Sequence, residues 1–276
     1  MNPMRVISLS TIPPRFPMIG AALRSLLAQS GRVDEIRLYV PRRYRRFPGY
    51  DGAVPEVPKG INLVRVDEDL GPASKVLFAA RELRGTQASI LFCDDDKIFA
   101  PHWAAELFDA QDERPNECVA LVGKPIPATM ARKSARQPVA RRGNGMEFEY
   151  RLRRLRQQLR SVMGKPSPRE MRRPVRQAGY VDILQGLGGA VVRPDFFDDA
   201  AYDIPDVLWA VDDVWLSGIL AKNGVPIWLP KGLKMPAPSD AHAIDSLYRS
   251  TIEGADRHEA NRRCIAYMQE RFGVWL

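Results

Sequence analysis

The sequence predicts an α/β fold in which a mainly parallel sheet carries helices on both faces. Short apolar runs typical of buried strands alternate with stretches whose apolar residues recur at helical spacing, and this alternation favours parallel strand pairing. The chain has 276 residues, 45% of them hydrophobic, which is enough to bury a core without a disulfide or a structural metal. In such sheets ligands bind beyond the carboxyl ends of the strands, so functional residues are expected there.

The expected elements follow one another from the N-terminus. They are a strand at residues 4–10, a helix within 13–29, strands at 35–40 and 61–66, a helix at 76–83 and a strand at 88–93. Prolines are confined to the start of the first helix, where they are tolerated. After residue 180 we expect a strand at 181–184, a glycine-rich turn (Gly186, Gly188, Gly189), a strand at 190–192, and helices at 212–221 and 255–272.

A basic insert, residues 128–177, divides the chain into segments 1–127 and 178–276. Between Arg132 and Arg176 the sequence has fifteen Lys or Arg and three acidic residues, so this stretch accounts for more than the whole net charge of +8. Within it, four apolar residues lie along one helical face and arginines occupy the others, which predicts a basic amphipathic helix. The apolar residues of this face are Leu152, Leu155, Leu159 and Met163.

The compartment is inferred from the cysteines and from the apolar runs. Cys93, Cys118 and Cys264 are odd in number and widely spaced, which indicates free thiols in a reducing compartment. The N-terminus lacks the pattern of a signal peptide, and no uninterrupted apolar stretch reaches the roughly 18 residues of a membrane span. We therefore expect a cytoplasmic protein, and peripheral attachment to the inner face of the membrane stays open.

Three consecutive carboxylates, those of Asp94, Asp95 and Asp96, directly follow the strand expected at 88–93. Adjacent carboxylates repel one another, and a cation relieves that repulsion. Hard oxygen ligands suit Mg²⁺ or Mn²⁺, which would bridge a diphosphate. The alternative interpretation is a solvated acidic turn.

Two further motifs accompany the triplet in a fixed order: STIPPR at residues 10–15, after the first strand, and LGPASK at 70–75, before a helix. Together the three motifs resemble the nucleotide-binding half of GT-A glycosyltransferases, particularly bacterial family 2-like enzymes that open with an SLTSIPPR-like segment and continue to a GPATK-like one. The resemblance covers roughly residues 4–103 and resumes over 181–245, and the basic insert is unmatched. It implies a GT-A (Rossmann-like) fold whose nucleotide-sugar-binding half is 1–127 and whose acceptor-side half, with the C-terminal helix, is 178–276.

The resemblance also implies roles for individual residues. The family's D-x-D motif corresponds to Asp94 and Asp96, of which Asp96 is the stronger metal candidate, while Asp95 is placed to reach the ribose or the metal. His242 corresponds to a C-terminal histidine that completes the metal site in many GT-A enzymes; a structural or solvated histidine is the alternative. Candidate contacts of the donor nucleotide are Thr11, Arg15, Asp69 and Lys75.

Charge supports part of this assignment, since Arg15 and Lys75 suit the neutralisation of a diphosphate. Ordinary surface charge is the alternative for both. UDP is the default nucleotide because UDP-sugars are the commonest donors for such sites. The acceptor, a carbohydrate or a lipid-linked molecule, is not identified by the sequence.

A second acidic pair, Asp212 and Asp213, stands at the expected start of a helix. Helix capping explains one carboxylate there and does not require two. The pair resembles the acidic element of inverting GT-A enzymes, which implies that Asp213, or failing it Asp212, is the general base on the acceptor hydroxyl.

Other functions remain as alternatives. A retaining GT-A enzyme shares the D-x-D site and needs no base at Asp213. A nucleotidyltransferase would carry a glycine-rich basic loop where this chain has TIPPR, and an aspartyl-phosphate phosphatase would carry its D-x-D after the first strand. A non-enzymatic protein could bind nucleic acid or anionic membrane lipid through the insert. A solvated insert or a lid is the remaining interpretation of that segment.

Overall fold

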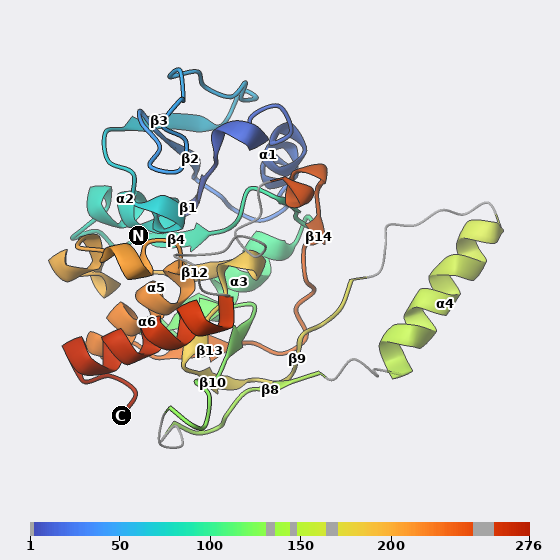
Figure 1. Cartoon of the computed structure of the whole chain (residues 1–276). Coiled ribbons are helices and arrows are strands. Elements are labelled where there is room, and N and C mark those ends of the chain that lie inside the picture. The colour runs from blue at the N-terminus through green and yellow to red at the C-terminus, as the bar shows by residue number, and fades with distance from the viewer. Residues whose placement is uncertain (1–2, 131–135, 144–147, 164–170, 245–256) are drawn as a thin grey trace.

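The computed structural model describes residues 3–130, 136–143, 148–163, 171–244 and 257–276. Its central feature is an eight-stranded sheet in the order β10-β13-β6-β12-β4-β1-β2-β3 within these residues (Figure 1). The strands are β1 (Arg5–Ser10), β2 (Glu35–Pro41), β3 (Asn62–Val66), β4 (Ser89–Phe92), β6 (Cys118–Ala120), β10 (Gly179–Val181), β12 (Ala190–Val192) and β13 (Ile227–Leu229). Strands β3, β2, β1 and β4 are parallel, whereas β12 is antiparallel to both of its neighbours.

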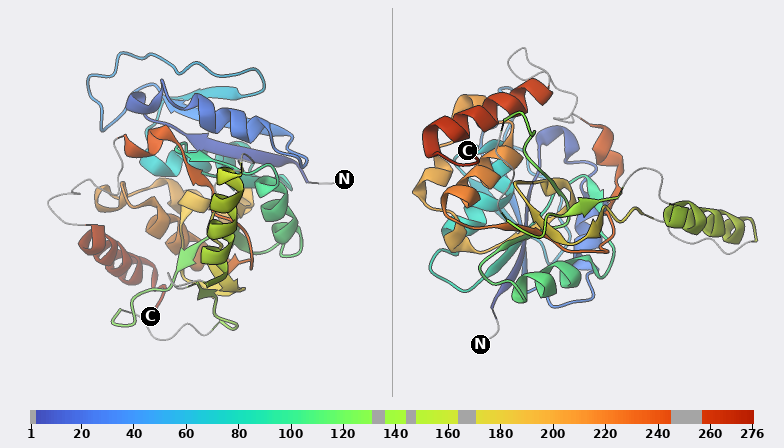
Figure 2. Two further views of the ribbon diagram at one scale, coloured as in Figure 1. Left: turned by 90° about the vertical axis from the view of Figure 1, so that its right-hand side faces the viewer. Right: turned by 90° about the horizontal axis from the view of Figure 1, so that it is seen from below.

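Helices cover both faces of this sheet, as Figure 2 shows. Alternate residues of one strand enter different cores: Val6 packs with the cluster under α2, α5 and α6, and Ile7 with the cluster under α1 and α3. The helices are α1 (Gly20–Leu27), α2 (Ser74–Glu82), α3 (Trp103–Asp112), α5 (Asp212–Lys222) and α6 (Arg257–Phe272). The predicted fold class, a mainly parallel sheet between two helical layers, is therefore confirmed.

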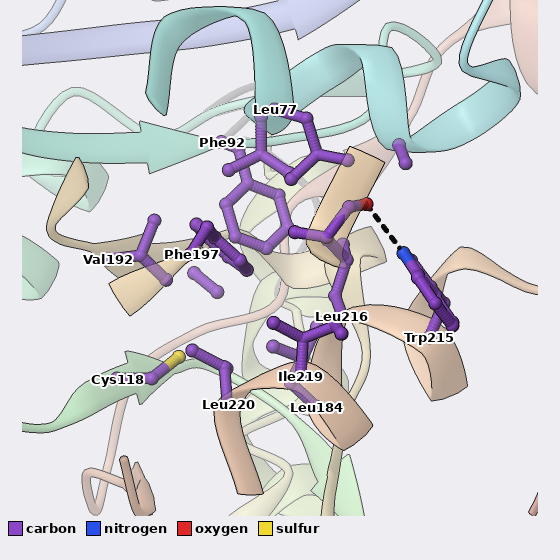
Figure 3. Packing of buried hydrophobic residues seen from close by; sticks show 14 of the residues in the cluster. Leu77, Phe92, Cys118, Leu184, Val192, Phe197, Trp215, Leu216, Ile219 and Leu220 are labelled. Atoms are coloured by element: carbon purple, nitrogen blue, oxygen red, sulfur yellow. Dashed lines mark hydrogen bonds between the residues drawn. The ribbon is translucent and has the colours of Figure 1, made fainter. Parts of the chain in front are cut away.

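The larger core fixes the first turn of α5 against the sheet. Phe92 at the end of β4 and Leu77 of α2 pack together with Leu216 of α5 (Figure 3). Trp215 is 1% exposed, and its Nε1 donates to the carbonyl of Ala201 at 2.9 Å. The beginning of α5 is thus held beside the end of β4, which is where the two acidic motifs of the sequence meet.

The structure departs from the expected elements at a few places. The first predicted helix is split into a 3-10 turn, Pro13–Arg15, and α1, which begins only at Gly20 after a third proline. Helix α3 and strands β6 and β13 were not predicted, and the strand predicted at 181–184 is divided between β10 and β11 (Ile183–Leu184). The predicted start of the last helix, near residue 255, lies outside the described residues, and its described part is Arg257–Phe272.

The expected basic amphipathic helix is present as α4 (Phe148–Val162). It stands away from the sheet and its covering helices in Figure 1 and in the right panel of Figure 2, beyond the short ribbon of β8 (Arg141–Arg142) and β9 (Val175–Gln177). The rest of the predicted insert, residues 131–135, 144–147 and 164–170, lies outside the described part of the chain. No helix among the described residues is both long and apolar enough to cross a bilayer.

Candidate functional site

A cavity of about 960 Å³ opens where β1 and β4 end and α5 begins. The ends of parallel strands and a helix N-terminus converge there, as expected for ligand binding in an open α/β sheet. Every residue that the sequence singled out as a contact, ligand or base lines this one cavity. These residues are Thr11, Arg15, Asp69, Lys75, Asp94, Asp95, Asp96, Asp212, Asp213 and His242.

Asp95 joins the loop after β1 to the acidic loop after β4. Its Oδ2 accepts a hydrogen bond from Thr11 Oγ1 at 2.5 Å, and its Oδ1 pairs with Arg15 Nη1 at 2.5 Å. Burial raises the pKa of this carboxyl, and the opposing effects of Arg15 and Thr11 do not cancel the rise. In this structure both oxygens of Asp95 bind protein groups and hold the two loops together.

The carboxylate of Asp96 contacts both the imidazole of His242 and the ammonium group of Lys97. Its Oδ2 lies 2.8 Å from His242 Nδ1, and its Oδ1 lies 2.8 Å from Lys97 Nζ. Burial disfavours the charge of Asp96, but Lys97 and its other partners outweigh this and hold the pKa of the carboxyl below its ordinary value. Because Asp95 and Asp96 are buried, the alternative interpretation of the triplet as a solvated turn is wrong.

Lys75 connects the two acidic motifs. Its Nζ lies 2.7 Å from Asp94 Oδ1 and 2.9 Å from Asp212 Oδ2, and it also lies over the ring of Phe92. Burial opposes its charge, yet Asp212 and Asp94 raise the pKa of the ammonium well above its ordinary value. Lys75 is 6% exposed and the Arg15 side chain 12%, so ordinary surface charge is the wrong interpretation for both.

Asp212 and Asp213 stand in the first turn of α5, and neither caps the helix. The N-cap position is Val211, without a side-chain cap bond. Asp212 pairs with Lys75, and Asp213 Oδ1 accepts a hydrogen bond from the backbone N–H of Gly186 at 2.9 Å. Burial, reinforced by the neighbouring charge of Asp212, raises the pKa of Asp213 to about 7.

The glycine-rich turn lets the backbone approach this network. A Cβ at Gly186 would lie 2.7 Å from Lys75 Nζ and 3.5 Å from Asp213 Oδ1. Gly189 has φ +94°, and a Cβ there would lie 2.4 Å from the Trp103 ring. The turn therefore requires glycine for close approach as well as for backbone conformation.

Asp69 lines the cavity and holds the loop before α2. Its carboxylate accepts backbone hydrogen bonds from Arg45 at 2.7 Å and Gly71 at 2.9 Å, and burial raises its pKa in spite of these bonds. Trp209 Nε1 donates to the carbonyl of Asp69 at 3.2 Å, and Arg45 lies over the Trp209 ring. The loop before α2 is thus tied to the loop before α5.

Sequence reasoning missed several residues of the cavity. Lys97 was overlooked although it directly follows the acidic triplet, and its sequence position was the available signal. Tyr44, whose hydroxyl donates to the carbonyl of Thr11 at 2.9 Å, and Trp209 come from loops without a recognisable motif. Only the packing of the loops brings them to the site.

Asp96 and His242 offer donor atoms for a divalent cation, which would replace Lys97 Nζ, now 2.8 Å from Asp96 Oδ1 and 3.0 Å from His242 Nδ1. A buried carboxylate and an imidazole meet there, and Asp96 Oδ1 accepts no well-aligned hydrogen bond from a described residue, although the Lys97 ammonium is close. Asp94 is held by Lys75 instead. No group of three or more His, Cys, Asp or Glu residues forms a ready metal cage in the described part of the chain. Mg²⁺ and similar ions are commonly held by one or two side chains together with substrate phosphates, so two ligands are compatible with a metal.

Comparisons with known proteins identify the fold. No protein-family profile matches the chain, and no curated protein matches it by sequence. Among solved structures it is similar to S. aureus TarS 1–349 in complex with UDP, at 13% identity over 98% of this chain and 67% of that one, with a TM-score of 0.48. It is also similar to GalNAc-T7 with UDP, GalNAc and Mn²⁺, at 11% identity over 97% of this chain and 47% of that one, with a TM-score of 0.50.

These identities support a statement about the fold alone, and the chain spans about half the length of the GalNAc-T7 structure, 47%. The chain therefore has the α/β GT-A fold that its sequence predicted.

Proposed function

We propose that this protein is a glycosyltransferase that moves a sugar from a nucleoside diphosphate, UDP by preference, to an acceptor hydroxyl. The observation that carries the proposal is the convergence of both acidic motifs on one cavity through Lys75. The structural neighbour with UDP, GalNAc and Mn²⁺ makes a UDP-sugar the first donor to test.

The donor would lie between the loops that follow β1 and β4. The nucleoside would lie against Asp69 and the backbone around it, while Arg15 and Lys75 supply positive charge beside the acidic loop. Both cations are ion-paired with carboxylates here. A diphosphate would therefore bind by redistributing existing ion pairs, which favours its arrival together with a cation.

Asp96 and His242 would hold a Mn²⁺ or Mg²⁺ ion, with Asp94 as a further candidate ligand if it leaves Lys75. When bound, the ion neutralises the charge that develops on the departing diphosphate. Lys75 and Arg15 add to that neutralisation from their places in the cavity wall.

Asp213 would act as the general base. The acceptor oxygen forms a bond to the anomeric carbon as the bond from that carbon to the diphosphate oxygen breaks, and the acceptor proton passes to the Asp213 carboxylate. A pKa of about 7 suits this task, because about half of the group is ionised at neutral pH and the ionised form is a competent proton acceptor. Single displacement inverts the anomeric configuration, and Asp212 would keep Lys75 in place.

The test is the release of nucleoside diphosphate from a panel of UDP-, GDP- and CDP-sugars, with wild type compared with Asp213→Asn. We expect the variant to lose about 10²- to 10⁴-fold in turnover while its affinity for the nucleotide is unchanged. Unchanged turnover in Asp213→Asn would contradict the assignment of Asp213 as the general base. A product with retained anomeric configuration would favour the retaining alternative instead.

A further inference from the structure

Helix α4 presents an apolar stripe that no described part of the chain covers. At 100° per residue its apolar side chains fall within an arc of about 100° along a helix about 22 Å long. All are exposed, among them Phe148 at 77%, Leu155 at 52% and Val162 at 87%. The stripe consists of Phe148, Leu152, Leu155, Leu159 and Val162, and Met163 continues it past the helix end.

The stripe is bordered by positive charge on both sides. Arg151 and Arg156 fall next to its two edges on the helical wheel, and three more arginines lie on the opposite face. The helix contains five arginines and one glutamate, a formal charge of +4. Exposed arginines also continue into the ribbon beneath it, at Arg141 and Arg142.

We propose that α4 is a membrane-docking helix that lies in the plane of an anionic phospholipid surface, with the apolar stripe among the acyl chains and the arginines at the headgroups. A narrow apolar face, a strongly basic polar face and low overall hydrophobicity are the properties of helices that lie in the interface. Anionic headgroups complement the charge on both borders of the stripe, and the long arginine side chains extend from the buried helix toward them.

The same features make other occupants of the stripe less suitable. A second copy of α4 would place one row of arginines against another along each border of the stripe, and like charges there oppose pairing. Duplex nucleic acid would use the charge but leave the leucines without a partner. The two aromatic residues of the helix offer little base stacking, since the Tyr150 ring lies against Arg172 at 5.2 Å.

The insert that carries α4 is connected to two strands that end at the cavity. The chain leaves the body after β7 (Gly123–Lys124) and returns through β10 to β11 (Ile183–Leu184), and β7 and β11 pair with each other. Lys124 and Gln185, at the ends of these strands, line the cavity. A membrane bound at α4 is therefore tethered to the wall of the candidate site, and, if the proposed function holds, this favours an acceptor presented at the lipid surface.

The experiment is cosedimentation of the full chain with vesicles, either of pure phosphatidylcholine or with about 30% phosphatidylglycerol, at low and high salt. Leu155→Gln with Leu159→Gln removes apolar area at constant charge. Leu27→Gln with Leu276→Gln changes two exposed leucines elsewhere and is the matched control. Arg154→Gln with Arg160→Gln removes charge and keeps the stripe.

We expect salt-sensitive binding to the anionic vesicles, at least about tenfold weaker in the Leu155/Leu159 variant and in the arginine variant, and unchanged in the control. Absence of binding to anionic vesicles by the wild type would overturn the proposal. Binding of the Leu155/Leu159 variant as strong as that of the wild type would also overturn it. So would binding to duplex DNA that is tighter than binding to vesicles, or self-association through the stripe without vesicle binding. Vesicle binding is measured without sugar transfer. The docking proposal can therefore fail or hold independently of the proposed glycosyltransferase activity.

Discussion

Lys75 is the residue at which the two acidic motifs meet, because its ammonium pairs with Asp94 after β4 and with Asp212 at the start of α5. Buried carboxylates that lose their counter-charge are strongly destabilising. Removal of Lys75 alone is therefore expected to destabilise the fold, because the carboxylates would stay buried without a counter-charge.

We predict that Lys75→Met lowers the free energy of unfolding by about 3–5 kcal/mol, because it leaves Asp212 and Asp94 without their ammonium partner. Urea denaturation measures the change. Lys59→Met, at an exposed lysine, is the control and should change stability by less than about 0.5 kcal/mol. Similar values for both variants would show that the Lys75 ion pairs do not stabilise the fold.

The raised pKa of Asp213 predicts the pH dependence of transfer. The base must be ionised, so the turnover rate should fall about tenfold per pH unit below pH 7, the value to which burial and Asp212 raise this pKa. Asp212→Asn removes the neighbouring charge and should move this acid limb to lower pH. A profile that is flat between pH 5 and 8 would contradict the assignment of Asp213.

The same carboxyl predicts how stability varies with pH. Its pKa rises from 3.8 to about 7 on folding, so the folded state holds the proton over a range where the unfolded state has lost it. Its contribution to stability is greatest below that range and declines as the pH rises toward 7. In Asp213→Asn this decline should be absent from the pH dependence of the unfolding free energy.

The sequence singled out ten residues that line one cavity, and it did not predict their contacts. Motif order placed Asp94, Asp96 and Asp213 on one cavity. The bond from Asp213 to Gly186 and the contact of Lys97 with Asp96 depend on loops distant in sequence that tertiary packing brings together. For that reason the sequence predicted surface charge or capping as alternatives at positions that proved to be buried ion pairs.

At the scale of elements, apolar periodicity predicted the strands and helices of the first ninety residues well. It could not show that β12 runs antiparallel between β4 and β6, because a three-residue strand buried on both faces has the same sequence pattern in either direction. Proline chemistry explains the late start of α1, since the prolines before it limit regular hydrogen bonding.

The turn before α2 provides a test of element packing. Gly71 has φ +59°, and a Cβ there would lie 2.9 Å from the Trp209 carbonyl oxygen, whereas Gly85 has φ +76° and open space around it. Gly85→Ala should cost about 1–2 kcal/mol for the backbone conformation alone. Gly71→Ala should cost at least about 1 kcal/mol more because of the collision with Trp209. Equal losses in chemical denaturation would show that the two loops are not tightly packed.

At the scale of the whole molecule, residues 144–170 of the basic insert are expected to be separable from the folded body, because the apolar side chains of α4 are exposed rather than packed in either core. Replacing residues 144–170 by a short glycine–serine linker should leave the melting temperature within about 2 °C of the wild type. The ends of this segment are held close by the pairing of β8 with β9. A drop of about 10 °C in a calorimetric scan would show that the insert belongs to the core.

The measurement that tests the central claim most directly is thermal stability with UDP, GDP, CDP and ADP, each with and without Mn²⁺. A nucleotide at about a hundred times its Kd stabilises the native state by about 2.7 kcal/mol, a rise of several degrees. We predict such a rise with UDP and Mn²⁺ together, its loss in Asp96→Ala, and its retention in Asp67→Ala, whose side chain is 90% exposed. No rise with any nucleotide at millimolar concentration would contradict a nucleotide-sugar site in this cavity.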